Sequence, residues 1–292
     1  MSCRVMGIVN VTPDSFSDGG KFFRPEEAIR RARNLIDEGA DIIDLGGEST
    51  RPGAIPLGWE EEWSRLEPVL RGLSPSRTGS VPLEMGTVPA ETGSVPSRMG
   101  SAPSQMGSVP SQMGTVPISV DTYHPETAER ALADGASIIN CVKSEPIPEM
   151  LKLCAKFGAE LVLPASAMGS VPSQTGSVPS QTGTVPPEMG SVPSQMGSVP
   201  IYLDPMIGFG TTREEDLERL KSIPLLATRG RVLVGASRKR IVKKLTGEKV
   251  PGKDLAGNLT IAVWAAMNGA SVVRVHDVRE TVQALKVLAA LR

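Results

Sequence analysis

Polar side chains that can bind a ligand or move charge stand where the apolar runs of this 292-residue chain end. They are Asn10, Asp44, Glu48, Asp121, Asn140, Asp204, Lys239, Arg274 and His276. Taken singly, each has an ordinary explanation: Asp121 is suited to a helix cap, and Asp204 before Pro205 to a turn. Polar residues that end six or more strands are harder to explain one by one. If the strands are parallel, these side chains share one rim and form a site.

The chemistry of these residues divides them into two groups. Asp121, Asn140 and Asp204 suit the polar edge of a flat heterocycle that carries ring N–H and amino donors. A carboxylate accepts two parallel N–H bonds from a 2-amino-4-oxo ring, as it does from a guanidinium. The other group suits an anion, above all a phosphate accompanied by a metal ion. Its members are Asn10, Arg51, Arg274 and His276.

Strand and helix patterns alternate along the chain. The expected strands are residues 5–9, 42–45, 118–120, 138–139, 161–163, 201–203, 232–235 and 272–275. The expected helices begin or lie near residues 25–38, 59–70, 125–134, 147–157, 214–220, 255–267 and 278–291. Eight strands with intervening helices predict an α/β fold of the (β/α)₈ TIM-barrel type, one domain over residues 1–292. No helix is expected between the fifth and sixth strands, which is a gap in the pattern.

Two long irregular segments follow the first two strands. The first, residues 11–20, is rich in turn formers and carries Phe16 and Asp18, and the second, residues 44–53, carries Thr50 and Arg51. A surface hairpin is the plain interpretation of the first segment. Ordinary strand-to-helix loops have about 2–6 residues, and longer ones usually carry function or are disordered. The sequence therefore favours a site built by these two segments.

Two tracts repeat a seven-residue unit of the type GSVPSQM, over residues 79–117 and 169–200. Glycine and proline in every unit exclude a coiled coil, and proline at this spacing excludes a continuous central strand. With little apolar surface to bury, the tracts are expected to be low-complexity insertions in the barrel. The second tract takes the place of the fifth helix.

Composition excludes several classes of protein. The net charge of −1 and the 3% of aromatic residues argue against a nucleic-acid partner, and no apolar run reaches the length of a membrane span. Cys3, Cys141 and Cys154 have no metal-ligand spacing and are interpreted as free thiols in a reducing compartment. The first strand follows directly on the N-terminus, so we expect no signal peptide and a cytoplasmic protein.

Six segments of the chain resemble the dihydropteroate synthase family of folate biosynthesis. They are MGIVNVTPDSFSDGG (6–20), DIIDLGGESTRPGA (41–54), ISVDT (118–122), LDPMIGFG (203–210), VGASRK (234–239) and VVRVHD (272–277). The first two motifs are long and specific, whereas SVDT and LDP alone are weak. The resemblance covers nearly everything outside the repeats, and implies an enzyme that joins a dihydropterin-methyl diphosphate to p-aminobenzoate and releases diphosphate.

The resemblance also implies roles for individual residues. The pterin would be bound by Asp121, Asn140, Asp204 and Lys239. The diphosphate would be bound by Arg274 and His276, with Val275 between them in the substrate wall, and Mg²⁺ by Asn10. The p-aminobenzoate site would be formed by Thr50, Arg51, Pro52 and the loop that carries Phe16 and Asp18, with Phe209 and Lys239 nearby. Lys239, Arg274 and His276 would be the catalytic residues. The family further implies a homodimer, for which the apolar last helices with Trp264 offer a face.

The chain departs from the family pattern near strands four to six. Asn140 is followed by Cys141 where the family commonly has aspartate, and Arg240 stands where serine is frequent. Residues 163–168 read LPASAM in place of a segment of the Met-His-Met type. These departures leave two alternatives open: a pterin-binding barrel of the methyltransferase type, and a catalytically impaired paralogue.

Overall fold

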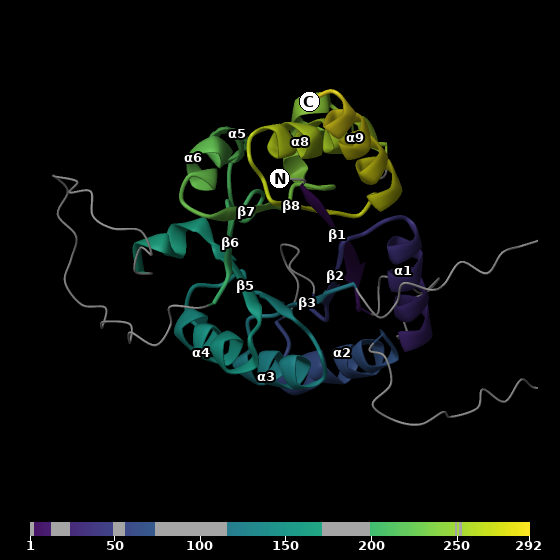
Figure 1. Cartoon of the computed structure of the whole chain (residues 1–292), viewed down its shortest axis with the longest axis vertical. Coiled ribbons are helices and arrows are strands. Elements are labelled where there is room, and N and C mark those ends of the chain that lie inside the picture. The colour runs from purple at the N-terminus through teal and green to yellow at the C-terminus, as the bar shows by residue number, and fades with distance from the viewer. Residues whose placement is uncertain are drawn as a thin grey trace, which may run out of the picture.

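In a computed structural model, eight parallel strands form a closed barrel, with helices arranged around it (Figure 1). The structure describes residues 3–12, 24–48, 56–73, 116–170, 199–248, 250 and 253–292, and of residues 168–170 the backbone alone. Each strand pairs with its neighbour in sequence, and the barrel closes where β1 pairs with β8. The predicted (β/α)₈ barrel is thereby confirmed.

The strands are β1 (Arg4–Asn10), β2 (Ile42–Gly46), β3 (Ile118–Asp121), β4 (Ile138–Asn140), β5 (Glu160–Pro164), β6 (Ile201–Asp204), β7 (Arg231–Val234) and β8 (Val272–Val275). The longer helices are α1 (Pro25–Asp37), α2 (Trp59–Leu73), α3 (Pro125–Ala133), α4 (Ile147–Phe157), α5 (Arg213–Lys221), α8 (Leu255–Met267) and α9 (Val278–Ala290). Three short elements were not predicted: a 3₁₀ helix (Ala165–Ser170), α6 (Ile223–Ala227) and α7 (Arg240–Thr246).

Local sequence explains where the helices begin and end. Pro25 and Pro125 occupy the first turn of α1 and α3, where a missing N–H removes no hydrogen bond. Thr212 and Glu215 form a reciprocal capping box at the start of α5. Gly158 ends α4 with a φ of +67°, a conformation that glycine adopts without strain.

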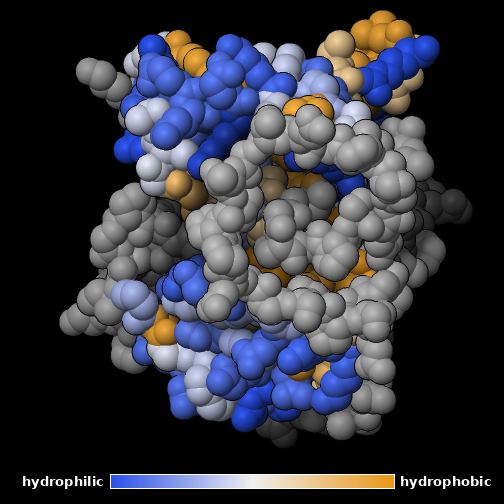
Figure 2. Space-filling model, turned by 90° about the vertical axis from the view of Figure 1, so that its left-hand side faces the viewer, coloured by the Kyte–Doolittle hydropathy of each residue, from blue (hydrophilic) through white to orange (hydrophobic). Residues whose placement is uncertain are grey.

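The apolar core has two parts. Seven side chains fill the inside of the barrel: Met6, Ile42, Ile138, Val162, Tyr202, Leu233 and Val272. The larger part lies between the outer faces of the strands and the surrounding helices. On the face seen in Figure 2, hydrophilic residues cover the upper and lower regions, and hydrophobic residues are visible between them.

Between β5 and β6 the structure describes the 3₁₀ helix and residues 199–200, and residues 171–198 of this connection lie outside the described residues. The repeat tracts 79–117 and 169–200 lie outside the described residues except at their ends. Among the described residues, no helix combines the length and the apolar character that a membrane crossing requires.

Candidate active site

A polar layer lies directly above the apolar layer inside the barrel. Because side chains alternate along a strand, the residue two positions after an inward-facing one also faces inward. This rule places Asp44 above Ile42, Asn140 above Ile138, Asp204 above Tyr202 and Arg274 above Val272, and the strand register sets Asp121 beside Asn140. The predicted polar residues at the strand ends therefore converge at the C-terminal end of the barrel.

Arg274 lies between two carboxylates at the centre of this layer. Its Nε and Nη2 approach Asp44 Oδ2 at 2.6 Å, and Nη2 donates to Asp121 Oδ2 at 2.7 Å. Asp44 is completely buried, so without the guanidinium its charge would be very unfavourable. Sequence reasoning placed Asp44 at a strand end and gave it no role, although it is the residue that holds Arg274.

Two buried acceptor atoms in this layer have no hydrogen-bond partner among the described residues. Asp44 Oδ1 and Asn140 Oδ1 have no hydrogen-bond partner among the described residues, while Asn140 Nδ2 is 3.5 Å from Asp44 Oδ2. A buried polar atom without a partner is unfavourable by about 1–3 kcal/mol, so these acceptors require donors, which a ligand or a water can supply.

Asp204 is held by the segment that follows β6. Its Oδ1 accepts the backbone N–H of Met206 at 2.7 Å, and Met206 has a φ of +60°, which is rare outside glycine. From α5, Arg219 donates to the Met206 carbonyl and Asp216 accepts the Gly208 N–H at 2.7 Å. The backbone strain is thus offset by contacts from a neighbouring helix, an arrangement frequent at functional sites.

Lys239 packs across the same segment. Its Nζ donates to the Ile207 carbonyl at 2.6 Å and lies 4.2 Å from the centre of the Phe209 ring. A Cβ at Gly208 would come within 2.9 Å of the lysine side chain, so glycine is required by this close approach. Burial lowers the pKa of Lys239 to about 8, although Asp204 works in the opposite direction.

The residues before Lys239 connect it with His276. Arg238 has a φ of +57°, its N–H donates to Asn258 Oδ1 at 3.0 Å, and its guanidinium pairs with Asp277 at 2.5 Å. Ser237 Oγ accepts the backbone N–H of His276 at 3.2 Å and lies 3.1 Å from its Nδ1. If Ser237 donates its hydroxyl hydrogen to Nδ1, the ring proton of a neutral His276 is on Nε2.

Burial is the largest influence on the pKa values of the titratable side chains in the site. It raises the pKa of Asp121 to about 7, against the effect of Arg274, and it also raises the pKa of Asp204. Burial together with the nearby Arg238 and Arg274 lowers the pKa of His276 to about 4. At neutral pH the imidazole is therefore a neutral hydrogen-bonding group.

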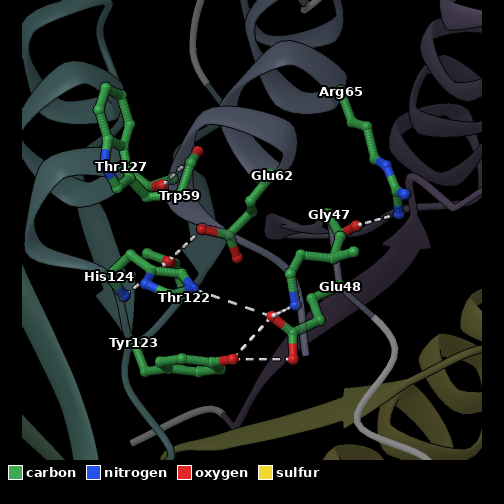
Figure 3. Close-up of polar contacts among 10 residues, drawn as sticks. Gly47, Glu48, Trp59, Glu62, Arg65, Thr122, Tyr123, His124 and Thr127 are labelled. Atoms are coloured by element: carbon green, nitrogen blue, oxygen red, sulfur yellow. Dashed lines mark hydrogen bonds and ion pairs between the residues drawn. The ribbon is translucent and has the colours of Figure 1, made fainter. Parts of the chain in front are cut away.

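A second polar cluster adjoins the site behind β3 (Figure 3). Glu62 of α2 accepts the Thr122 hydroxyl at 2.6 Å, and the Tyr123 hydroxyl lies 2.8 and 2.9 Å from the carboxylate oxygens of Glu48. Glu62 was not singled out from the sequence, where it is the third of three consecutive glutamates.

Not every predicted site residue has its side chain in this layer. Val275 packs in the outer core between strands and helices, because it alternates with Arg274 along β8, so only its backbone faces the rim. Arg240 donates to the Thr211 carbonyl at 3.0 Å. Asn10 ends β1 beside Gly46. Thr50, Arg51, Pro52, Phe16 and Asp18 lie outside the described residues.

The arrangement combines an acceptor layer with cationic groups at one rim. Buried carboxylates and an amide can take the N–H donors of a polar ring, as the sequence indicated. Arg274, Lys239 and neutral His276 supply donors to an anion next to it. A site of this kind can bind a heterocycle with an anionic substituent and stabilise that substituent as it leaves.

Comparisons with known proteins agree with this geometry. Residues 6–94 and 104–276 match the profile of the family described as pterin binding enzyme. The dihydropteroate synthase of Staphylococcus haemolyticus is 34% identical over 278 residues, which are 94% of this chain and 90% of that protein.

Solved structures give the same result. The dihydropteroate synthase of Xanthomonas albilineans with 4-aminobenzoic acid has a TM-score of 0.72 and 32% identity, over 99% of this chain and 93% of that one. The same enzyme in complex with 7,8-dihydropteroate has a TM-score of 0.70 and 29% identity, over 99% and 94%. With most of its length matched by the family profile, and with such relatives, the chain belongs to the pterin binding enzyme family.

Proposed function

We propose that the chain is a dihydropteroate synthase, which joins p-aminobenzoate to a dihydropterin-methyl diphosphate and releases diphosphate. The observation that carries the proposal is the buried acceptor layer at the C-terminal end of the barrel, with Asp44 Oδ1 and Asn140 Oδ1 unpaired among the described residues. The relatives named above are dihydropteroate synthases, and one of their structures contains the product, 7,8-dihydropteroate.

The pterin is proposed to lie against this layer. Asp121, Asn140 and Asp204 would accept its ring and amino N–H groups, and Lys239 would donate to its carbonyl side. Asp204 has one oxygen committed to the Met206 N–H, which fixes the carboxylate and directs the other oxygen to the ligand. Charge on these carboxylates would also stabilise a pterin that becomes cationic at its methylene group.

The leaving diphosphate is assigned to Arg274 and His276. Arg274 uses Nε and Nη2 for its two carboxylates, so Nη1 is the group that would meet the anion. The Nε2–H of neutral His276 would donate a second hydrogen bond. The C–O bond breaks with its electron pair on the diphosphate, the lone pair of the arylamine forms the C–N bond, and the amine proton passes to solvent. No covalent enzyme intermediate is needed.

We also propose Mg²⁺ as cofactor, held by the Asn10 side-chain oxygen together with the diphosphate. Mg²⁺ favours oxygen ligands and often takes only one or two from the protein, with substrate phosphates and waters completing its shell. In the described part of the chain, no three His, Cys, Asp or Glu residues gather as a metal site. Bound there, Mg²⁺ would neutralise charge on the leaving oxygens.

A homodimer in the cytoplasm is proposed as the form of the enzyme. At the C-terminal helices, Met267, Val287 and Leu291 are 57%, 61% and 79% exposed, and apolar side chains in such number favour a covered surface. Cys141 and Cys154 are buried free thiols, as is usual in a reducing compartment. Sedimentation at several protein concentrations would detect the dimer, and a monomer at all of them would contradict it.

The function is tested by incubating the protein with the pterin diphosphate, p-aminobenzoate and Mg²⁺ and measuring diphosphate and dihydropteroate. Equal amounts of both products are expected, and chelation of Mg²⁺ should stop the reaction. Pterin binding without diphosphate release would instead identify a catalytically impaired paralogue. Methyl transfer from a methylated pterin, without condensation, would identify the methyltransferase type.

A further inference from the structure

Glu62 is a buried carboxylate that the proposed reaction does not use. It lies in the first turn of α2 after Glu60 and Glu61, which are exposed, whereas Glu62 is 1% exposed. Gly47 sets this position: a Cβ there would approach Glu62 Cγ to 3.0 Å and Leu66 Cγ to 3.1 Å, so α2 packs directly on the backbone at the end of β2. Burial raises the pKa of Glu62, as expected for a carboxylate removed from water.

The hydrogen bond from Glu62 leads to the residue that connects two predicted pterin ligands. Its Oε2 accepts the Thr122 hydroxyl at 2.6 Å, and the backbone N–H of Thr122 donates to the Asn140 carbonyl at 3.1 Å. Thr122 directly follows Asp121, which pairs with Arg274. Thr122 thus connects the ends of β3 and β4, the two strands whose last residues, Asp121 and Asn140, point into the site.

The Thr122 hydroxyl also orders the chain that follows it. Its oxygen accepts the backbone N–H of His124 at 3.1 Å, so the hydroxyl hydrogen is available to Glu62 alone. Figure 3 shows Glu62 reaching from α2 toward Thr122, while Tyr123 and His124 lie toward Glu48. A hydrogen bond that only joined α2 to the start of α3 could be made anywhere along the two helices. The Glu62–Thr122 bond is made at the residue next to Asp121, and this position links it to the site.

We propose that Glu62 is a positioning residue for the pterin: through Thr122 it fixes Asp121 and Asn140 in the geometry that accepts the ring donors. This rests on the proposed function, because it assigns the ring edge to these two residues. Misplacement of a binding group by about 1 Å can reduce a rate or an affinity by about a hundredfold, so a hydrogen bond behind the site has a measurable effect at the site.

The experiment compares Thr122→Val, Glu62→Leu and the double variant Glu62→Leu/Thr122→Val. Pterin affinity is measured by calorimetry with the dihydropterin-methyl diphosphate, alongside KM for p-aminobenzoate and the melting temperature. Thr122→Val is expected to weaken pterin binding about tenfold to a hundredfold and to leave KM for p-aminobenzoate within about twofold. Thr122→Ser, which keeps the hydroxyl, should restore pterin affinity.

The double variant separates positioning from stability. Glu62→Leu leaves the Thr122 hydroxyl without its acceptor, and Thr122→Val leaves the buried Glu62 carboxylate without its donor. The double variant removes both members of this pair, so its melting temperature should lie above that of Thr122→Val. It should stay below that of the wild type, because the His124 N–H also loses the Thr122 oxygen as its acceptor. Pterin affinity should stay low, because the hydrogen bond that fixes Thr122 beside Asp121 and Asn140 is still missing, although Arg274 continues to hold Asp121. Recovery of affinity together with the melting temperature would overturn the proposal and leave Glu62 as a structural contact.

A matched control breaks another polar contact of α2, which it makes with the end of α3. Asp134 at the end of α3 pairs with Arg71 of α2 at 2.9 Å, far along both helices from Thr122. Asp134→Asn should change pterin affinity by less than about twofold, since exposed pairs contribute little. Wild-type protein that neither binds the pterin nor condenses it would refute the proposed function. Wild-type binding that Thr122→Val leaves unchanged would refute the role of Glu62 alone.

Discussion

Both ends of the barrel carry charged side chains around its apolar interior, but the hydrogen bonds and ion pairs of these side chains differ between the two ends. At the N-terminal end, Tyr202 lies between Arg4 and Arg231, whose guanidinium carbons are 5.7 and 5.4 Å from its ring centre. Its hydroxyl meets both arginines and lies 3.1 Å from Glu160, which in turn pairs with Arg231 at 2.8 Å. Each charge there has an opposite charge beside it.

At the C-terminal end the charges are paired, but hydrogen-bonding capacity is left over. Arg274 pairs with two carboxylates, while Asp44 Oδ1 and Asn140 Oδ1 keep no partner among the described residues. Backbone strain at Met206 and Arg238 occurs at the same end. The comparison teaches that one end of the barrel is built for stability and the other for a ligand, as is general for barrels of this type.

The largest effect is expected from Arg274→Met. Methionine fills similar space without charge, so Asp44 and Asp121 would remain as buried carboxylates with no cation between them. Unfolding in urea should show a loss of about 3–5 kcal/mol, and kcat/KM for condensation should fall about a thousandfold. Adding Asp44→Asn should recover part of the stability and none of the activity. Activity near that of the wild type would show that the C-terminal end does not depend on this guanidinium.

Asp204→Asn should have the next largest effect and should leave the fold intact. The amide oxygen can still accept the Met206 N–H, but the NH₂ group would then face the ring donors of the pterin. A buried donor opposed to another donor costs about 1–3 kcal/mol, which lowers pterin affinity about 5-fold to 150-fold. Calorimetry with the pterin diphosphate measures this loss, and an unchanged affinity would remove Asp204 from the site.

Much of this contrast was predictable from the sequence, because the signals are local. Apolar runs located the strands, Pro25 and Pro125 located helix starts, and polar residues marked the strand ends. The partner of Asp44 was not predictable, since Arg274 lies 230 residues away and only barrel closure brings them together. For Val275, alternation along β8 was the signal that excludes its side chain from the rim.

The position of Glu62 within the apolar stripe of α2 was a signal in the sequence that was not used. Trp59, Trp63, Leu66 and Leu70 mark the buried stripe of α2, and Glu62 falls within it at helical spacing. A carboxylate in an apolar stripe requires a partner, which could have been inferred. The short helices α6 and α7 had no comparable signal, because five and seven residues give too little periodicity.

The free energy of unfolding should depend on pH through residues at the C-terminal end of the barrel, where His276 and Asp121 contribute with opposite sign. Burial lowers the pKa of His276 from 6.5 to about 4, so between these values the unfolded chain binds more protons. Its contribution is complete above pH 6.5 and is lost as the pH falls toward 4. Burial raises the pKa of Asp121 from 3.8 to about 7, so its contribution is lost as the pH rises through 7.

Urea unfolding between about pH 4.5 and 7.5 would separate the two contributions. The stability difference between wild type and His276→Asn should grow with rising pH, and that between wild type and Asp121→Asn should shrink. Tyr202→Phe, at the N-terminal end, should give a constant difference over this range. Flat differences for both C-terminal variants would contradict the assigned burial effects.

Tyr202→Phe tests the N-terminal end of the barrel, where we expect an effect on stability and none on activity. It removes the hydroxyl that meets Arg4, Arg231 and Glu160 and leaves the ring that fills the barrel interior. The free energy of unfolding should fall by about 1–2 kcal/mol, while kcat/KM should stay within about twofold. A large loss of activity would mean that the two ends are coupled.

The smallest effect is expected from the first repeat tract. It connects Leu73 at the end of α2 with Ile118 at the start of β3, which is the N-terminal end of the barrel. Replacing residues 86–113 by a short Gly/Ser linker should shift the melting temperature by less than about 2 °C, because the repeats offer little apolar surface and loop length adds closure entropy slowly. A fall of more than about 5 °C would show that the tract packs on the barrel.

The pairing of β1 with β8 has a consequence for synthesis on the ribosome. Domains emerge from the N-terminus at about 5–20 residues per second, so β8 is the last strand to become available. Until it pairs, β1 and β7 are open edges, and the guanidinium that joins Asp44 to Asp121 is absent from the nascent chain. A chain arrested before residue 272 therefore holds two inward-facing carboxylates without their arginine. The strand that closes the barrel is also the strand that completes its charge.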